Sequence, residues 1–299
     1  MRGNGMWTNR GRAGAAIAVL VLIGGLGLWA GRRIADTRPV VRETIEPAPV
    51  AQSAASASGG ETDDPATELR RLRGPNARPA GVTPSRSFDL PRGRAVDVVA
   101  ALQPRAEAGD AEAAMYLFIK IDECRRQLYR DGHQARPAPV RGDSVEAQLI
   151  ARTPPDCHGL TLDQYQNNVR WLEQAADAGI AMAQRSYAGN AEAVVGNSSQ
   201  MLAHPEKVVA YRRKAMQYLR QAAVNGSVEA LIELGDAYDR GILAQRDPMR
   251  AYAYYYATDL VSPSAYGRQR LQTYAAHLEP SQLATATQQG RRIYEACCR

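Results

Sequence analysis

The sequence lacks the short motifs that mark the common enzyme families. It contains no Gly-x-Ser-x-Gly, no His-Glu-x-x-His and no phosphate-binding glycine loop. Ser-x-x-Lys and Lys-Thr-Gly, which mark serine β-lactamases, do not occur either. The sequence therefore predicts no catalytic or cofactor-binding residue, and an enzyme would have to be a hydrolase of a type without a recognisable motif.

Lysine is scarce, and this bears on nucleic-acid binding. Only Lys120, Lys207 and Lys214 occur among 299 residues, so arginine carries almost all of the net charge of +6. The basic clusters are short and scattered, whereas a nucleic-acid interface gathers cations on one face. We predict no nucleic-acid partner.

Metal-binding patterns are missing as well. There is no Cys-x-x-Cys pair, and Cys157-His158 is not supported as a catalytic pair because adjacent side chains seldom meet. The four histidines are isolated from one another: His133, His158, His204 and His277. We predict no metal site.

Four cysteines are present, and two of them bracket an insertion. Residues 124–157 form a loop-rich stretch with little core of its own, between Cys124 and Cys157. A disulfide between them would contribute about 4 kcal/mol in the chain-entropy model, and two buried free thiols are the alternative. We predict the disulfide. Cys297 and Cys298 receive no role, because neighbouring cysteines rarely pair with each other.

The N-terminal third predicts a membrane anchor and a linker. Residues 13–31 carry no charge, and at a rise of about 1.5 Å per residue they nearly span a bilayer core of about 30 Å. We predict a single-pass inner-membrane protein with residues 1–12 in the cytoplasm and the C-terminal domain in the periplasm. A cleaved signal peptide is the alternative. Residues 32–90 are rich in Pro, Ala and Ser, which predicts a disordered linker.

Residues 207–256 have a strong helical periodicity. Ala215, Tyr218, Leu219 and Ala222 recur at offsets of three and four, the spacing of one helix face. Asn225-Gly226 ends this helix, and a second helix, a loop and a third helix follow. Related patterns occur upstream, including a helix predicted over residues 161–178. The sequence therefore predicts stacked helical hairpins.

These residues resemble the Sel-one-like repeat, a relative of the tetratricopeptide repeat. The resemblance rests on paired alanines, aromatic residues, glycines and an aspartate at fixed offsets over residues 94–258. The residues that define the repeats are Gly109, Trp171, Gly179, Tyr218, Gly226, Gly235, Tyr238, Gly241 and Asp247.

The resemblance implies an all-α superhelical repeat fold over residues 91–260, interrupted by the insertion. Residues 261–299 are expected to form capping helices. It also implies a bacterial, non-enzymatic scaffold or adaptor of the cell envelope that binds partner proteins.

A second candidate function is binding of peptidoglycan or another glycan. Tyr252 and Tyr256 are four residues apart, so their rings lie one helical turn apart and could stack on sugars. Burial of the two rings under the C-terminal helices is the alternative.

Overall fold

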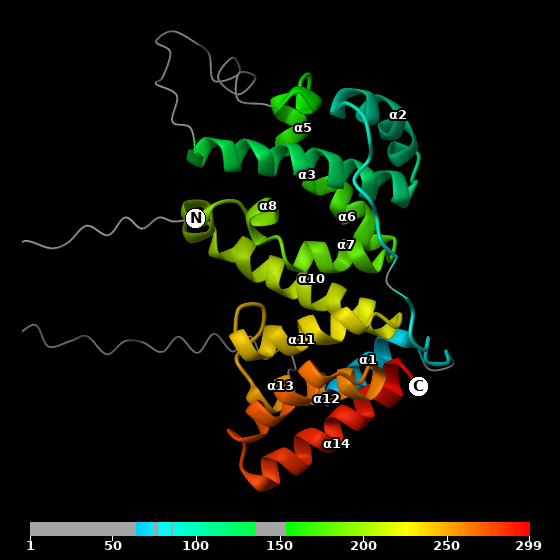
Figure 1. Ribbon diagram of the computed structural model, residues 1–299, viewed down its shortest axis with the longest axis vertical. Coiled ribbons are helices and arrows are strands. Elements are labelled where there is room, and N and C mark those ends of the chain that lie inside the picture. The colour runs from blue at the N-terminus through cyan, green and yellow to red at the C-terminus, as the bar shows by residue number, and fades with distance from the viewer. Residues whose placement is uncertain (1–63, 75–76, 85, 135–153) are drawn as a thin grey trace, which may run out of the picture. The chain divides into compact units, whose positions relative to one another are not determined.

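The computed structural model describes residues 64–74, 77–84, 86–134 and 154–299. All of them lie in the larger of two compact units, residues 58–299, and every regular element among them is a helix (Figure 1). In chain order these are α1 (Pro65–Arg73), α2 (Ala95–Glu107), α3 (Ala111–Gln134), η1 (Pro155–Cys157), α5 (Leu162–Gln166), α6 (Val169–Asp177), α7 (Ala181–Ala188), α8 (Ala191–Val195), α9 (Ser198–Ala203), α10 (Pro205–Val224), α11 (Val228–Arg240), α12 (Pro248–Val261), α13 (Ala265–Ala275) and α14 (Pro280–Cys297). The predicted all-α class is confirmed for this part of the chain.

The predicted location as a single-pass inner-membrane protein with a periplasmic domain requires correction. Among the helices of the described ranges, none is both long enough and apolar enough to cross a bilayer. The segments that carried this prediction, residues 1–12 and 13–31, lie outside the described residues.

The helices stack in chain order as antiparallel pairs. Contacts run from α2 to α3, then to α6, α7, α10, α11 and α12, and α14 covers α12 at the end (Figure 1). Fully buried alanines, such as Ala175, Ala176, Ala222 and Ala223, allow neighbouring helices to approach closely. The stack is therefore held together by one continuous apolar core.

Three of the tight turns between paired helices have the same geometry. Gly109, Gly179 and Gly226 all have positive φ, at 98°, 88° and 89°. Each donates its N–H to the carbonyl three residues earlier, and the residue after each donates to the carbonyl five residues earlier. This is the hydrogen-bond pattern of a Schellman cap, which needs a residue that adopts left-handed φ without strain. The spacing of these glycines therefore marks the repeats.

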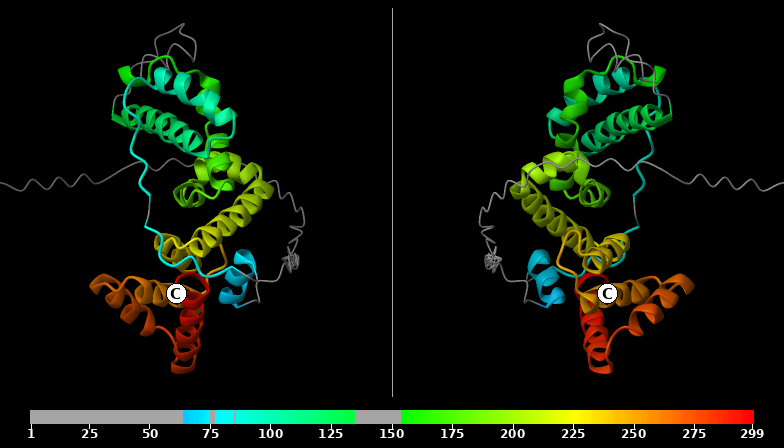
Figure 2. Two further views of the ribbon diagram at one scale, coloured as in Figure 1. Left: turned by 90° about the vertical axis from the view of Figure 1, so that its right-hand side faces the viewer. Right: turned by 90° about the vertical axis from the view of Figure 1, so that its left-hand side faces the viewer.

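The described residues between positions 64 and 90 differ from the disordered linker predicted over residues 32–90. Residues 65–73 form α1, which packs against α10 and α14. Residues 77–84 and 86–90, which we call the arm, run without a helix toward the start of α2 (Figure 2). Asp64-Pro65 begins α1, and Ala66 and Leu69 have no exposed surface. Burial of these two apolar side chains offsets the entropy lost when α1 becomes ordered. The neighbouring residues of the linker have few apolar side chains to bury.

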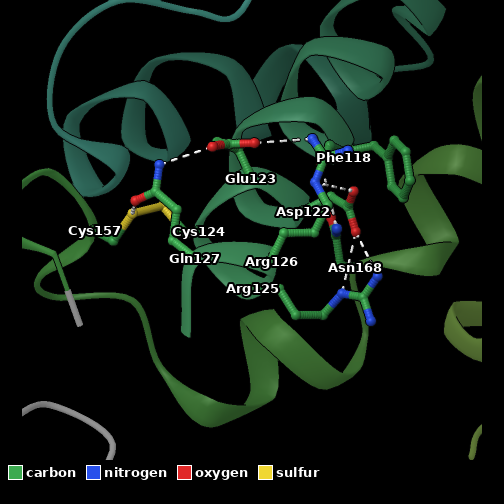
Figure 3. Close-up of polar contacts among 9 residues, drawn as sticks. All are labelled: Phe118, Asp122, Glu123, Cys124, Arg125, Arg126, Gln127, Cys157 and Asn168. Carbon is green, nitrogen blue, oxygen red and sulfur yellow. Dashed lines mark hydrogen bonds and ion pairs between the residues drawn. A yellow bond between two sulfur atoms is a disulfide. The ribbon is translucent and has the colours of Figure 1, made fainter. Parts of the chain in front are cut away.

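A second difference concerns the helix predicted over residues 161–178. It is broken into α5 and α6 at Asn167 and Asn168. The Asn168 amide is buried and donates to the Phe118 carbonyl on α3, at 3.3 Å (Figure 3). The break therefore lies where a buried amide joins this segment to α3.

Candidate interaction groove

A groove runs between α7 and α11, the second helices of two successive repeats. These helices touch each other little, and α10 packs against both of them from behind. Two hollows lie along this groove, one near the N-terminal ends of α7 and α11 and one near their C-terminal ends. We call the whole feature the α7–α11 groove.

The first hollow has a volume of about 540 Å³. Ile180, Ala181 and Met182 at the start of α7 form its apolar side, and Asn225 and Ser227 come from the turn before α11. Residues 83, 84 and 86–88 of the arm form the opposite wall. This hollow therefore lies between the repeat turns and a segment that precedes the repeats.

The second hollow has a volume of about 390 Å³. Tyr211 and Leu219 of α10 and Ala188 of α7 contribute apolar surface, and Ile242 beyond α11 is 58% exposed. The Tyr211 hydroxyl donates to the Ala188 carbonyl, and burial raises the Tyr211 pKa to about 12. The phenol is therefore neutral at ordinary pH and fixes α10 against α7.

An ion pair lies between the two hollows. Arg185 Nε is 2.8 Å from Glu233 Oε1, and Glu229 lies 4.0 Å from the same guanidinium. Burial raises the Glu233 pKa, and Arg185 opposes that shift. Because α7 supplies the cation and α11 the acids, the Arg185–Glu233 pair holds the walls together and gives the guanidinium at the centre of the groove a carboxylate partner.

The arm already occupies one end of the groove. Thr83 donates its backbone N–H to the Gly226 carbonyl at 3.0 Å and its hydroxyl to the Asn225 carbonyl at 2.8 Å. Farther along, the Phe88 ring packs on Tyr116 with centroids 5.2 Å apart. The turn at the end of α10 thus binds an extended chain through its main-chain carbonyls.

The remaining residues predicted to define the repeats lie in the helix interfaces. Trp171 and Tyr218 are nearly buried, and the Tyr218 hydroxyl donates to Asp177. Tyr238 stacks on Tyr254 with centroids 5.8 Å apart. At Gly235, a Cβ would lie 2.4 Å from the Tyr255 ring.

Two further repeat residues shape the connection between α11 and α12. Gly241 ends α11 in the left-handed conformation, with φ of 70°. Asp247 caps α12 by accepting the Arg250 N–H at 3.0 Å. Both positions are therefore structural.

Tyr252 and Tyr256, the possible sugar-stacking pair, lie at the contact between α12 and α14. Their rings stack on each other with centroids 6.1 Å apart, and Tyr252 is 7% exposed. A Cβ at Gly290 of α14 would be 2.9 Å from the Tyr256 ring. Tyr252 is therefore buried and Tyr256 is partly buried against α14.

The predicted disulfide is confirmed. Cys124 of α3 and Cys157 of η1 are bonded, with Cα atoms 5.6 Å apart and both side chains buried (Figure 3). The bond ties the two ends of the insertion together, and residues 135–153 of that insertion lie outside the described residues. Cys297 and Cys298, left without a role by the sequence, are bonded to each other and buried.

Sequence reasoning missed the arm and α1. The signal that could have found α1 is Asp64-Pro65, the same start as the correctly placed Asp247-Pro248 of α12. The surrounding residues are rich in Pro, Ala and Ser, and this composition led to the prediction of a disordered linker. No local signal indicated that the arm would reach the α7–α11 groove, because Thr83 bonds there to a residue 142 positions away.

Comparison with known proteins gives a weak structural match. No protein-family model matches the chain, and no curated protein matches it significantly. A solved structure does match: a protective antigen of uropathogenic Escherichia coli strains that displays an SLR fold. The two are 16% identical with a TM-score of 0.26, and the match covers 69% of this chain and 57% of that one.

The chain spans little more than half of that antigen's length. At this identity and TM-score the match says nothing about function. The antigen has the predicted Sel-one-like fold, and the repeated glycine turns of the chain itself agree with the prediction.

Proposed function

We propose that this chain is a non-enzymatic protein-interaction scaffold that binds an extended segment of a partner protein in the α7–α11 groove. The observation that carries the proposal is the arm, whose extended backbone is hydrogen-bonded to the turn at Asn225-Gly226 beside the 540 Å³ hollow. A groove that binds one extended chain through main-chain carbonyls has the geometry to bind another.

The chemistry of the groove indicates what kind of segment fits. The apolar side chains of Ile180 and Met182 line one hollow, and Ile242 and Leu243 line the other. The cation at the centre, Arg185, is paired with acids of α11. A partner with two apolar side chains separated by a short neutral spacer would bury both of them without leaving a charge unpaired.

The finer proposal is an adaptor role in the bacterial cell envelope. It rests on the resemblance to Sel-one-like repeat proteins. The Cys124–Cys157 disulfide is compatible with an extracytoplasmic protein, since such bonds persist in oxidising compartments.

Site-specific photo-crosslinking in cells tests the groove. A photoreactive residue at Met182 is expected to capture a discrete partner, identified by mass mapping of the cross-linked peptide. The matched control carries the same photoreactive residue at Gln217, which is exposed on α10 and lines neither hollow. This position should not capture the partner that is captured at position 182.

A blocking variant completes the test. Ala181→Trp fills the first hollow next to Met182 and should abolish the cross-link while the circular dichroism spectrum stays unchanged. Equal products from positions 182 and 217, or a product that survives Ala181→Trp, would show that the partner binds elsewhere.

A further inference from the structure

α1 lies in a second groove, between α10 and α14, far along the chain from its own sequence position. It packs against both helices (Figure 1). Ala66 and Leu69 are fully buried there. The Arg73 guanidinium donates to the Ala296 carbonyl near the end of α14. We call this feature the α10–α14 groove.

Two arginines of the groove pair with two acids of α1 and its N-cap, and these pairs select the helix that fits. Glu68 Oε2 is 3.0 Å from Arg220 Nε on α10, and the Arg220 side chain is only 13% exposed. Asp64, four residues before Glu68, is 3.1 Å from Arg292 on α14. Such a pair adds little net stability, but a helix without the acid would leave the mostly buried Arg220 cation without its carboxylate. The groove therefore discriminates against helices that lack these acids.

α1 owes its helical state to this docking. It has nine residues, and a helix so short is not stable alone in water. Gly74, with φ of 88°, ends it, and most described residues of the arm that follow are exposed. α1 thus behaves as a short segment that folds on binding, joined to its site by an extended tether.

We propose that the α10–α14 groove is a docking site for a short amphipathic helix of a partner protein. The helix that fits carries a Glu directly before a Leu and an Asp four residues before the Glu. α1 occupies the site in cis. This proposal is independent of the α7–α11 groove, because the two surfaces share no residue named here.

Fluorescence anisotropy on the full chain tests the proposal, with a labelled peptide of residues 64–74 as the probe. The wild-type chain should bind it weakly, because the tethered α1 competes at an effective concentration on the order of millimolar. Leu69→Asp removes the buried anchor of α1 and should tighten peptide binding at least tenfold.

A charge exchange identifies the site. In the Leu69→Asp background, Arg220→Glu should lower the peptide affinity at least tenfold, and a peptide with Glu68→Arg should recover it. Arg212→Glu, an exposed arginine on the same helix, is the matched control and should change nothing. A peptide that keeps only Asp64, Glu68 and Leu69, with alanine elsewhere, should bind within tenfold of the original.

Folding is checked by helical content and thermal midpoint. If Leu69→Asp fails to fold, Glu68→Arg, which places two cations together at Arg220, releases α1 instead. The proposal fails if a folded variant with α1 released from the groove does not bind the peptide. It also fails if Arg220→Glu leaves the peptide affinity unchanged. It fails equally if the released chains dimerise through exchanged α1 helices, because the occupant is then a second copy.

Discussion

The two ends of the helix stack are closed by different means. At the N-terminal end the Cys124–Cys157 disulfide joins α3 to η1, and buried Lys120 donates to the Pro91 and Gly93 carbonyls. At the C-terminal end α14 covers α12, and α1 packs against α14. One end is closed by a covalent bond between residues 33 positions apart, and the other by a helix from more than 200 positions earlier.

The two ends of the stack cover their exposed apolar faces in two different ways. The terminal helices of a repeat stack have no neighbour on one side, so their apolar faces need a cap. The N-terminal helices carry a long insertion, and a disulfide limits the entropy of that loop. The C-terminal helices are rich in tyrosine, and their apolar faces are covered by α14 and α1. The two ends should therefore fail under different conditions.

Alkaline pH should have the largest effect, and it should act on the tyrosine-rich part. Burial raises the pKa of five phenols, to about 12 for Tyr211 and further for Tyr187, Tyr218, Tyr254 and Tyr255. An unfolded tyrosine ionises near pH 10, so these groups stabilise the fold fully below about pH 10. That stability is lost as pH rises toward the folded pKa values.

We expect cooperative unfolding between about pH 10 and 12, followed by circular dichroism together with tyrosinate absorbance. Tyr211→Phe should move the midpoint upward. A full helical signal at pH 12, together with complete tyrosinate absorbance, would contradict the claim that the neutral buried phenols stabilise the fold.

Removing the N-terminal disulfide should have the next largest effect. The double variant Cys124→Ser, Cys157→Ser should lose about 4 kcal/mol of unfolding free energy, because a loop of 33 residues is no longer closed in the unfolded chain. Urea unfolding measures the loss. The matched control, Cys297→Ser with Cys298→Ser, opens no loop and should lose much less. Equal losses would mean that loop entropy is not the cause.

A methyl group at Gly235 should destabilise the C-terminal end. Alanine usually favours a helix over glycine, but here its Cβ would be 2.4 Å from the Tyr255 ring. That ring is held by a 2.7 Å hydrogen bond to Asp236 and by Arg270 above its face. We expect Gly235→Ala to cost about 1–3 kcal/mol in urea unfolding. Gly189→Ala, whose Cβ would meet atoms no closer than 3.7 Å, should not destabilise the chain.

The ion pair that links the arm to the N-terminal end should matter least. Arg86 donates to Glu112 through both terminal guanidinium nitrogens, Nη1 and Nη2, but the two side chains are 61% and 46% exposed. Exposed pairs are screened by water and salt. Arg86→Ala should leave the thermal midpoint unchanged within error. A clear drop would show that the arm contributes more to the cap than its exposure indicates.

The repeat core was predictable because its signals are local. Gly179 and Gly226 terminate their helices through bonds within five residues, and Asp247 caps α12 within three. The candidate grooves were not predictable in the same way. Arg185 meets Glu233, and Glu68 meets Arg220, only after separate helices have packed, and no spacing in the sequence encodes those distances.

The sequence by itself determined the all-helical class, the glycine turns that pair the helices, and the disulfide across the insertion. Each of these depends on backbone conformation or chain closure, which are properties of short segments. Only the tertiary structure decided that α1 and the arm are ordered, that Tyr252 and Tyr256 are packed under α14, and that Cys297 bonds Cys298. The reason is burial: the free energy that orders these residues comes from surfaces distant in the chain.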